Sequence, residues 1–254
     1  NMKIGFTSTS FRQIRSIEKI VKTASESGAD CIEWGGDVHI KDIESARLAK
    51  KLCRDAGIEI SSYGSYYRVG SKKSDEWKNI CEIASALGAK SIRVWLGNKD
   101  SEKTDESTYK LLVEDGKIIC SVAAEYNLTV SPECHDKTFN NNTDAFLKIR
   151  QDIDCKNFKT YFQSRYKRKE YDLDRIERTM PYIESIHISY SEQTREQFPN
   201  FNPTYIDTLL DKVKQSGFNG TVLLEYTYLC GYFGFPSSMI KDIKKLKKKM
   251  GEQS

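Results

Sequence analysis

The sequence contains no apolar run of membrane-spanning length, and no signal-peptide-like apolar segment precedes its first predicted strand. Its seven cysteines, an odd number, form no CxxC pair and follow no regular spacing, which favours a reduced compartment. Most of them fall inside periodic apolar segments and are interpreted as small buried hydrophobic residues, namely Cys31, Cys53, Cys81 and Cys120. We therefore expect a cytoplasmic protein that does not associate with membranes.

An excess of charge of one sign is also absent, because 40 Lys and Arg residues against 36 Asp and Glu residues leave a net charge of only +4. The basic run Lys241–Lys249 shares its segment with Ile240, Ile243 and Leu246, whose helical spacing is typical of a buried stripe. A solvated last helix is therefore favoured over a nucleic-acid-binding patch. We expect no nucleic-acid partner, and the sequence does not decide between a monomer and a homodimer.

The sequence does contain a regular alternation of strand-like and helix-like segments. Strands are predicted at Lys3–Thr7, Asp30–Glu33, Ile58–Tyr63, Ser91–Trp95, Leu128–Glu133, Phe158–Gln163, Ser185–Ser189 and Thr221–Glu225. Helices are predicted at Ile17–Ser27, Asp42–Ala56, Asp75–Leu87, Asp105–Tyr126, Thr143–Ile153, Leu173–Met180, Thr204–Ser216 and Ser237–Met250. Four of these helices end at a glycine just before the next strand, namely Gly28, Gly57, Gly88 and Gly217.

Eight consecutive strand–helix units without a break in composition predict an α/β protein with a single (β/α)8 TIM barrel over residues 2–250, followed by a disordered tail at 251–254. A doubly wound open sheet is the competing architecture. It usually places a glycine-rich phosphate-binding turn after its first strand, whereas the turn here is Thr7-Ser8-Thr9-Ser10. The barrel is therefore favoured.

Four apolar runs in the second half of the chain each lead into a side chain that can bind a metal. These side chains are Glu133, Gln163, His187 and Glu225. Because the carboxyl ends of the strands of a TIM barrel converge on one face, we expect the four to meet in space. Two carboxylates, an imidazole and an amide oxygen suit one divalent ion such as Mn²⁺, Mg²⁺, Co²⁺ or Zn²⁺. His187 alone would be interpreted as a core histidine, and only the joint occurrence of the four residues favours a metal site.

Several short motifs, taken in their order and spacing, carry a resemblance to a known family. They are Ile32-Glu33-Trp34-Gly35-Gly36-Asp37-Val38-His39, Ser62-Tyr63-Gly64-Ser65-Tyr66-Tyr67, Arg93-Val94-Trp95-Leu96-Gly97, Pro132-Glu133-Cys134-His135, Tyr161-Phe162-Gln163, His187-Ile188 and Leu224-Glu225-Tyr226. Over nearly its whole length the chain resembles the sugar phosphate isomerase/epimerase group of xylose-isomerase-like barrels.

This resemblance implies one divalent metal ion bound by Glu133, Gln163, His187 and Glu225. Many members of the group carry Asp where this chain has Gln163, and a neutral amide oxygen should bind the metal less tightly than a carboxylate. The resemblance also implies that Glu133 and Glu225 remove and return a proton next to a carbonyl, through a metal-stabilised enediolate. The expected reaction is isomerisation or epimerisation of a sugar or sugar phosphate.

Two histidines are candidates for binding the small carbohydrate substrate. His135 follows Glu133 by two residues, so both side chains should project to the same face of an extended segment. There His135 would contact the substrate or orient a metal ligand. His39 has the equivalent position after the second predicted strand.

Four further candidates for substrate binding are Tyr63, Arg93, Trp95 and Arg165. A guanidinium group can anchor an anion or hydroxyl groups, but Arg93 is equally well explained by an ion pair with Glu33 inside the barrel. Arg165 opens the basic run Arg165–Lys169, which is usually a solvated loop. The two aromatic residues are suited to stacking on a sugar ring, although core packing is the commoner role of such a residue.

Three other functions are weighed against a sugar isomerase. A dehydratase acting on a keto-inositol would begin with the same proton abstraction, so this lyase activity is an alternative. A barrel that binds a sugar without converting it is another, and Gln163 favours it because a weakened site loses metal more easily. An endonuclease acting at abasic sites in DNA is disfavoured, because its metal cluster needs more histidines than the three in this sequence and its substrate needs a basic face.

Overall fold

The structure is a computed structural model and describes residues 2–164, 169–189, 203–226 and 235–251. Its strands are β1 (Lys3–Thr7), β2 (Cys31–Gly35), β3 (Glu59–Val69), β4 (Ser91–Leu96), β5 (Thr129–Pro132), β6 (Thr160–Gln163), β7 (Ile183–Ile188) and β8 (Thr221–Leu224). Its α-helices are α1 (Ile17–Ser27), α2 (Ile43–Asp55), α3 (Ser74–Leu87), α4 (Glu106–Glu125), α5 (Thr143–Ile153), α6 (Lys169–Thr179), α8 (Pro203–Gln215) and α9 (Pro236–Met250).

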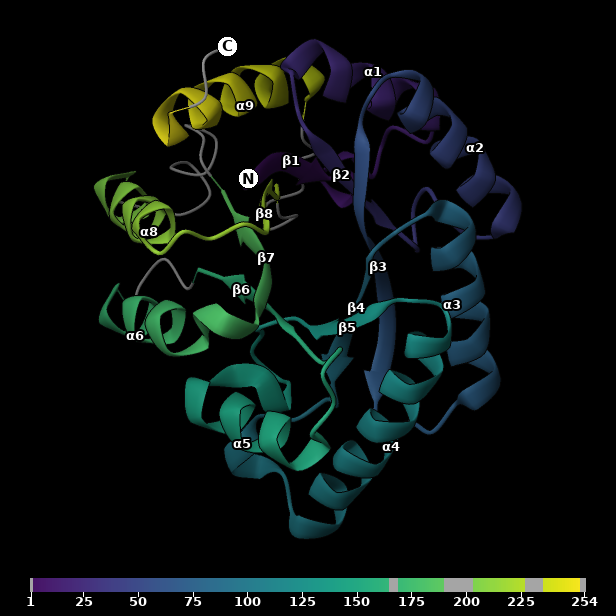
Figure 1. Ribbon diagram of the computed structural model, residues 1–254, viewed down its shortest axis with the longest axis vertical. Helices are drawn as coiled ribbons and strands as arrows, with labels where there is room; N and C mark the ends of the chain where they lie inside the picture. The colour runs from purple at the N-terminus through teal and green to yellow at the C-terminus, as the bar shows by residue number, and fades with distance from the viewer. Residues whose placement is uncertain (1, 165–168, 190–202, 227–234, 252–254) are drawn as a thin grey trace.

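The eight strands form one parallel sheet in the order β5-β4-β3-β2-β1-β8-β7-β6. The two ends of this order meet at an isolated parallel bridge between Val130 and Phe158, so the barrel is nearly closed. The helices surround the strands on the outside, from α1 and α2 at the upper right of Figure 1 to α8 and α9 at its upper left. The predicted TIM-barrel architecture is confirmed.

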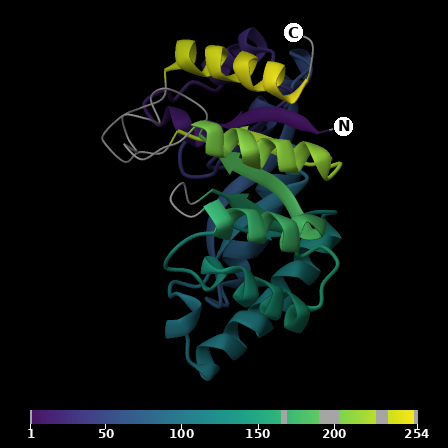
Figure 2. The ribbon, with the colours of Figure 1, turned by 90° about the vertical axis from the view of Figure 1, so that its left-hand side faces the viewer.

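The helices are amphipathic and pack their apolar faces on the strands. In α1 the side chain of Ser16 accepts a hydrogen bond from the backbone N–H of Lys19 and caps the first turn. The apolar face of α1 includes Ile20 and Ala24, both fully buried. The four glycines predicted to end helices have φ between 69° and 81°, a left-handed conformation that glycine adopts without strain, namely Gly28, Gly57, Gly88 and Gly217. Figure 2 shows α8 and α9 side by side.

Strand β3 continues well beyond its predicted end at Tyr63. After an irregularity in its pairing with β4, Arg68 lies opposite Trp95 and Val69 opposite Leu96. Aromatic and β-branched residues in this stretch suit an extended backbone, and the period-2 pattern alone did not reveal the added length. The extension places the exposed side chain of Tyr66 beside Trp95, with ring centroids 6.4 Å apart.

The remaining expectations concern the chain end, the cysteines and membrane association. Gly251 ends α9 with φ 83°, and the rest of the predicted tail lies outside the described residues. The six described cysteines are free. None of the described helices is both long enough and apolar enough to cross a membrane.

Candidate metal centre and active site

Three of the four predicted metal ligands form one cluster at the carboxyl ends of the strands. Glu133 directly follows β5, His187 is the next-to-last residue of β7, and Glu225 directly follows β8. One potential ligand atom of each lies within 4.8 Å of those of the other two. Gln163, the last residue of β6, reaches the same place, because its Nε2 lies 3.1 Å from Oε2 of Glu225. The barrel therefore brings all four predicted ligands together.

The two ring nitrogens of His187 have different surroundings. Nε2 lies 3.3 Å from Oε2 of Glu33, which is a hydrogen-bonding contact. Nδ1 has no hydrogen-bond partner among the described residues, although it is buried and lies 3.4 Å from Glu225 and 3.9 Å from Glu133. Burial alone would lower the pKa of His187, but the negative charges of Glu33 and Glu225 outweigh it and raise that pKa to about 10.

Glu33 is a fully buried carboxylate that holds this part of the barrel together. It interacts with donors from three other strands besides His187: Ser62 at 2.8 Å, Arg93 at 3.1 Å and Tyr161 at 2.7 Å. Burial by itself would raise the pKa of Glu33, but the charges of His187 and Arg93 together with these hydrogen bonds hold that pKa well below its usual range. Glu33 is therefore a charged group whose hydrogen-bonding capacity is satisfied inside the protein.

The two glutamates of the cluster differ in their preferred protonation state. Burial raises the pKa of Glu133, and the negative charge of Glu225 adds to this effect. For Glu225, burial also acts to raise the pKa, but the charge of His187 outweighs it and the pKa lies below its usual value. Two carboxylates with pKa values displaced in opposite directions are the arrangement expected of a general acid and a general base.

The residues of the cluster fit a divalent cation. Nδ1 of His187 is aimed at the two carboxylates, while Glu33 on the opposite nitrogen orients the ring, as carboxylates commonly do for metal-binding histidines. A cation could therefore be held by Glu133, His187 and Glu225, with Gln163 adjacent. In the structure Gln163 donates its Nε2 hydrogens to Glu225, so ligation by its Oε1 requires the amide to turn over.

Two of the predicted substrate-binding residues lie together near the cluster. The ring centroids of Trp95 and His135 are 4.6 Å apart, and the guanidinium of Arg68 lies 4.7 Å from the centroid of the Trp95 ring. His135 directs its Nδ1 to the backbone oxygen of Asp136. Both rings are partly exposed, so the pair lies where a substrate could contact it.

Arg93 has the structural role that the sequence left open as an alternative. It is 2% exposed and forms an ion pair with Glu33, and its Nε lies 3.8 Å from Oε2 of Glu133. A Cβ atom at Gly64 would lie 3.1 Å from the guanidinium, so this glycine leaves room for it. Arg93 therefore links the buried carboxylate to one of the predicted metal ligands.

The structure does not bring His39 and Tyr63 into the cluster. Both ring nitrogens of His39 are engaged inside the protein, with Oγ of Ser8 at 3.0 Å and the backbone oxygen of Ile14 at 2.6 Å. Tyr63 is buried in the core and donates its hydroxyl hydrogen to the backbone oxygen of Ile40. These contacts are those of packing residues. Arg165 lies outside the described residues.

Sequence reasoning missed two tyrosines that contribute to the site. Tyr161 is fully buried and hydrogen-bonds to Glu33, and its position two residues before Gln163 on the same strand was the available signal. Tyr66 is 44% exposed, accepts a hydrogen bond from Arg12 at 2.8 Å, and lies 5.5 Å from the guanidinium of Arg93. The position of Tyr66 on a strand could not be predicted, because the third strand was predicted to end at Tyr63 and extends to Val69 in the structure.

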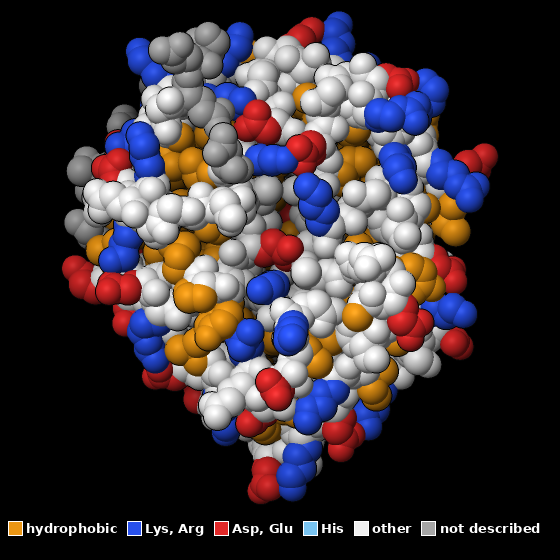
Figure 3. All heavy atoms as spheres, in the orientation of Figure 1, with side chains coloured by type: hydrophobic (Ala, Val, Ile, Leu, Met, Phe, Trp, Pro, Cys, Tyr) orange, Lys and Arg blue, Asp and Glu red, His pale blue; other side chains and the backbone are white. Residues whose placement is uncertain are grey.

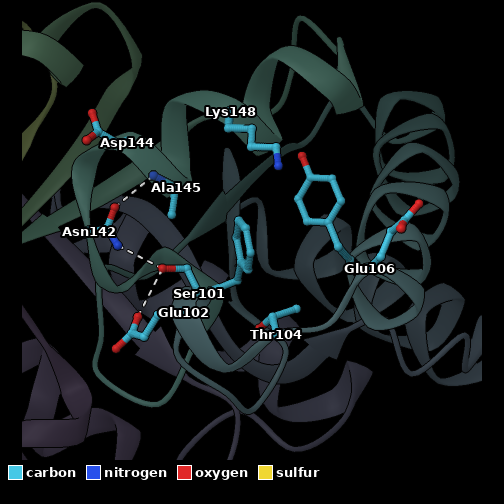
Figure 4. Close-up of a pocket in the computed structure, with 10 residues that line it drawn as sticks. Ser101, Glu102, Thr104, Glu106, Asn142, Asp144, Ala145 and Lys148 are labelled. Carbon is cyan, nitrogen blue, oxygen red and sulfur yellow. Dashed lines mark hydrogen bonds between the residues drawn. The ribbon is translucent and has the colours of Figure 1, made fainter.

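A surface pocket of about 530 Å³ is separate from this cluster. It is formed around the starts of α4 and α5, and Tyr109 and Phe139 line it with rings 5.2 Å apart. In Figure 4 its polar contacts connect Asn142, which caps α5, with Ser101. None of the predicted site residues lines this pocket, so the strand-end cluster remains the candidate site.

The surface charge is mixed rather than concentrated. On the face shown in Figure 3, basic and acidic side chains are interspersed, without a broad area of one sign. Many of the lysines of the described chain pair with neighbouring acidic groups, as Lys249 does with Asp211 at 2.9 Å.

Comparison with known proteins relates this arrangement to a family. A 3-dehydroshikimate dehydratase from Bacillus anthracis is 23% identical over 198 residues, which cover 73% of this chain and 71% of the relative. The crystal structure of the probable 3-DHS dehydratase AsbF from the same organism has a TM-score of 0.78 at 20% identity, and the match covers 97% of this chain and 99% of that one. D-allulose 3-epimerase from Methylomonas sp. has a TM-score of 0.78 at 14% identity, with 98% of each chain covered.

These structural likenesses, at identities of 20% and below, show a common fold. The family assignment comes from a family model described as the xylose isomerase-like TIM barrel, which matches residues 21–249. This range contains seven of the eight strands and all residues of the candidate metal site. The chain belongs to the family of xylose isomerase-like TIM barrels.

Proposed function

We propose that this protein is a divalent-metal-dependent enzyme that isomerises or epimerises a sugar or sugar phosphate by moving a proton at a carbon next to a carbonyl. The observation that carries the proposal is the environment of His187. Its buried Nδ1 makes no well-formed hydrogen bond with a described residue and faces Glu225 at 3.4 Å and Glu133 at 3.9 Å, while Nε2 is held by Glu33. Such a set of groups supplies both a metal site and two carboxylates able to transfer protons.

Glu225 is assigned the role of general base. In the metal-free protein the charge of His187 outweighs the effect of burial and holds the pKa of Glu225 below its usual value. A bound cation would take over this role when it displaces the proton of His187, so the carboxylate form is available to accept a proton. Nε2 of Gln163 donates to its Oε2 at 3.1 Å and thereby limits the rotation of the carboxylate. Glu225 also retains some exposure, which leaves it accessible to a substrate.

Glu133 is assigned the role of general acid. In the metal-free protein burial raises the pKa of Glu133, so this carboxyl group holds a proton more readily than Glu225 and is the group assigned to return one to the substrate. As the substrate C–H bond breaks, its electron pair forms a C=C bond and the carbonyl π electrons move onto oxygen. A divalent cation bound at the cluster would act as a Lewis acid and stabilise the negative charge that develops on this oxygen.

The carbon that receives the returning proton determines the product. Return to the opposite face of the same carbon gives an epimer, whereas return to the former carbonyl carbon gives an aldose–ketose isomerisation. The partly exposed aromatic residue Trp95, next to His135, supports a carbohydrate as the substrate. The free state of the six described cysteines supports a reducing compartment, and we place the reaction in the cytoplasm.

Dehydration is the second candidate reaction, and the sequence similarity to a 3-dehydroshikimate dehydratase favours it. The first step is the same: Glu225 takes a proton next to a ketone. The adjacent C–OH bond then breaks, a C=C bond forms, and the proton of Glu133 leaves with the hydroxyl group as water. Isomerisation and dehydration therefore use the same two glutamates. They differ in whether the proton of Glu133 returns to a carbon atom or leaves with the hydroxyl group as water.

A screen in D₂O tests the proposal and separates the two reactions. Protein loaded with Mn²⁺ is incubated with ketoses, keto-inositols, their phosphates and 3-dehydroshikimate, and Glu225→Gln serves as the control. An isomerase or epimerase incorporates deuterium at a carbon without losing water, whereas a dehydratase forms a product lighter by one water molecule. Absence of both results with every compound would overturn the proposed proton abstraction.

A further inference from the structure

The barrel is least regularly paired between β5 and β6, where the first and last strands of the sheet order meet. We call this place the seam, and it lies beside Glu133. The two strands share no ladder within the described chain, only the bridge between Val130 and Phe158 near their amino-terminal ends. Further along, the backbone N–H of Glu133 donates to Val94 of β4 at 3.0 Å. The carbonyl groups of Pro132 and Glu133 require other partners on the β6 side of the seam.

Asn140 supplies those partners. It belongs to the short 3₁₀ segment Phe139–Asn141 and is fully buried. Its Nδ2 lies 3.2 Å from the oxygen of Pro132, 3.0 Å from that of Glu133 and 3.3 Å from Oγ1 of Thr160 on β6. Thr160 in turn donates to the oxygen of Pro132 at 3.0 Å. A single amide group thus spans the open seam where the predicted metal ligand leaves the sheet.

The orientation of this amide is fixed by Arg175 of α6. Nη2 of Arg175 donates to Oδ1 of Asn140, and because a guanidinium is only a donor, the NH₂ group must face the two carbonyl oxygens. Arg175 is itself fully buried, and within the described residues it forms no ion pair, whereas Arg178 on the same helix pairs with Asp144 and Asp174. Its further contacts are Tyr171 at 3.4 Å and the ring of Phe146 at 5.9 Å.

A buried guanidinium without a carboxylate is costly, so its contact with Asn140 must be a principal source of compensation. The packing of α6 is therefore connected through one side-chain amide to the backbone of Glu133. We propose that Asn140, oriented by Arg175, is a positioning residue that holds Glu133 in the geometry required for metal binding. This inference rests on the proposed function, since it takes the cluster to be a metal site.

The same seam contains a matched control at its opposite end. Nδ2 of Asn157 also donates to two backbone carbonyl groups, those of Cys120 at 2.8 Å and Leu128 at 3.1 Å. Asn157 therefore makes the same kind of double contact as Asn140, but it lies before β6 rather than beyond β5. Its removal should loosen the seam without reaching Glu133.

The test compares Asn140→Ala with Asn157→Ala in chelator-stripped protein. Mn²⁺ is titrated, free ion is followed by electron paramagnetic resonance, and thermal unfolding is measured in parallel. Both variants should lower Tm, but only Asn140→Ala should weaken Mn²⁺ binding, by about tenfold or more. Asn157→Ala should stay within about twofold of the wild type, a difference that a purely structural role of Asn140 would not produce.

Asn140→Asp provides a second variant if Asn140→Ala does not fold. It retains size and the contact with Arg175, but it places a carboxylate oxygen against the carbonyl groups of Pro132 and Glu133. It should therefore also weaken Mn²⁺ binding. Unchanged affinity in the Asn140 variants, or an equal loss in Asn157→Ala, would overturn the inference. Failure of the wild type to bind Mn²⁺ would instead overturn the proposed metal site, and the inference would fall with it.

Discussion

Oε2 of Glu33 lies 3.3 Å from Nε2 of His187, and this contact determines which nitrogen of the imidazole faces the two glutamates at the mouth of the barrel. With Nε2 engaged, Nδ1 points toward Glu133 and Glu225. The ring is thus prepared to bind a cation through one nitrogen while a buried carboxylate holds the other. Glu33 is in turn fixed by donors from β3, β4 and β6.

Glu33→Gln should weaken Mn²⁺ binding by about 10- to 100-fold, because it removes the charged partner that orients His187. It should also lower the pKa of His187, which Glu33 raises toward about 10. Nuclear magnetic resonance titration of the imidazole signals measures this change, and three histidines in the chain keep the assignment simple.

Glu184→Gln is the control for Glu33→Gln. Glu184 is a partly buried carboxylate of the same barrel, and its partners are the hydroxyl groups of Thr129 and Ser131. Its neutralisation should change Mn²⁺ affinity by less than about twofold, since it does not contact the metal ligands. Equal effects of the two substitutions would show that Glu33 has no special relation to His187.

The affinity for metal should increase with pH. In the metal-free protein His187 carries a proton at neutral pH because its pKa is raised to about 10, and a metal must displace that proton from Nδ1. Mn²⁺ affinity should therefore rise by up to about tenfold per pH unit between pH 6.5 and 8.5. Titrations at three pH values check this, and an affinity independent of pH would contradict the assigned protonation state.

The stability of the metal-free protein should change with pH in the opposite direction. A pKa raised from 6.5 in the unfolded chain to about 10 in the folded state means that the folded state binds the proton more tightly. This stabilisation is complete below about pH 6.5 and is lost as the pH rises toward 10. Chemical denaturation of chelator-stripped protein should show the decline, and His187→Gln should remove this component of it.

Glu225→Gln should abolish deuterium exchange from solvent into the substrate while the fold remains intact. Loss of a general base typically reduces the rate by about 10²- to 10⁴-fold. The measurement is made at saturating Mn²⁺, with Tm recorded to confirm folding and with Glu184→Gln as the control. Exchange at the wild-type rate in Glu225→Gln would refute the role of Glu225 as the base.

Gln163→Asp should tighten Mn²⁺ binding, because it adds a charged oxygen to a site that otherwise has two carboxylates. Gln163→Glu tests the same idea with a longer reach. In the metal-free state both variants place a second carboxylate beside Glu225 and lose the hydrogen bond from Nε2, so their Tm should fall when chelator is present. Equal Mn²⁺ affinity in all three proteins would show that Gln163 is not a ligand and that water completes a three-residue site.

The sequence was sufficient to predict the barrel and the strand-end location of the ligands, because strand–helix alternation and strand ends are local features. It was not sufficient to predict which way a side chain faces within a layer. His39 and Tyr63 lie at strand ends as expected, but their side chains form hydrogen bonds inside the protein, with the backbone oxygens of Ile14 and Ile40. Which strands meet at the seam of a barrel is also a non-local property, so nothing in the sequence marked Asn140.

Whether the strand-end cluster binds a metal ion can be tested by anomalous scattering from a crystal of the protein soaked in Mn²⁺. We expect one strong peak between Glu133, His187 and Glu225, at about 2.0–2.3 Å from their ligand atoms, with Nδ1 of His187 as the nitrogen ligand. The peak should be absent or weak in crystals of His187→Gln. If a saturating soak leaves the cluster without a peak, or places manganese only elsewhere on the protein, then Glu133, His187 and Glu225 do not form a metal site.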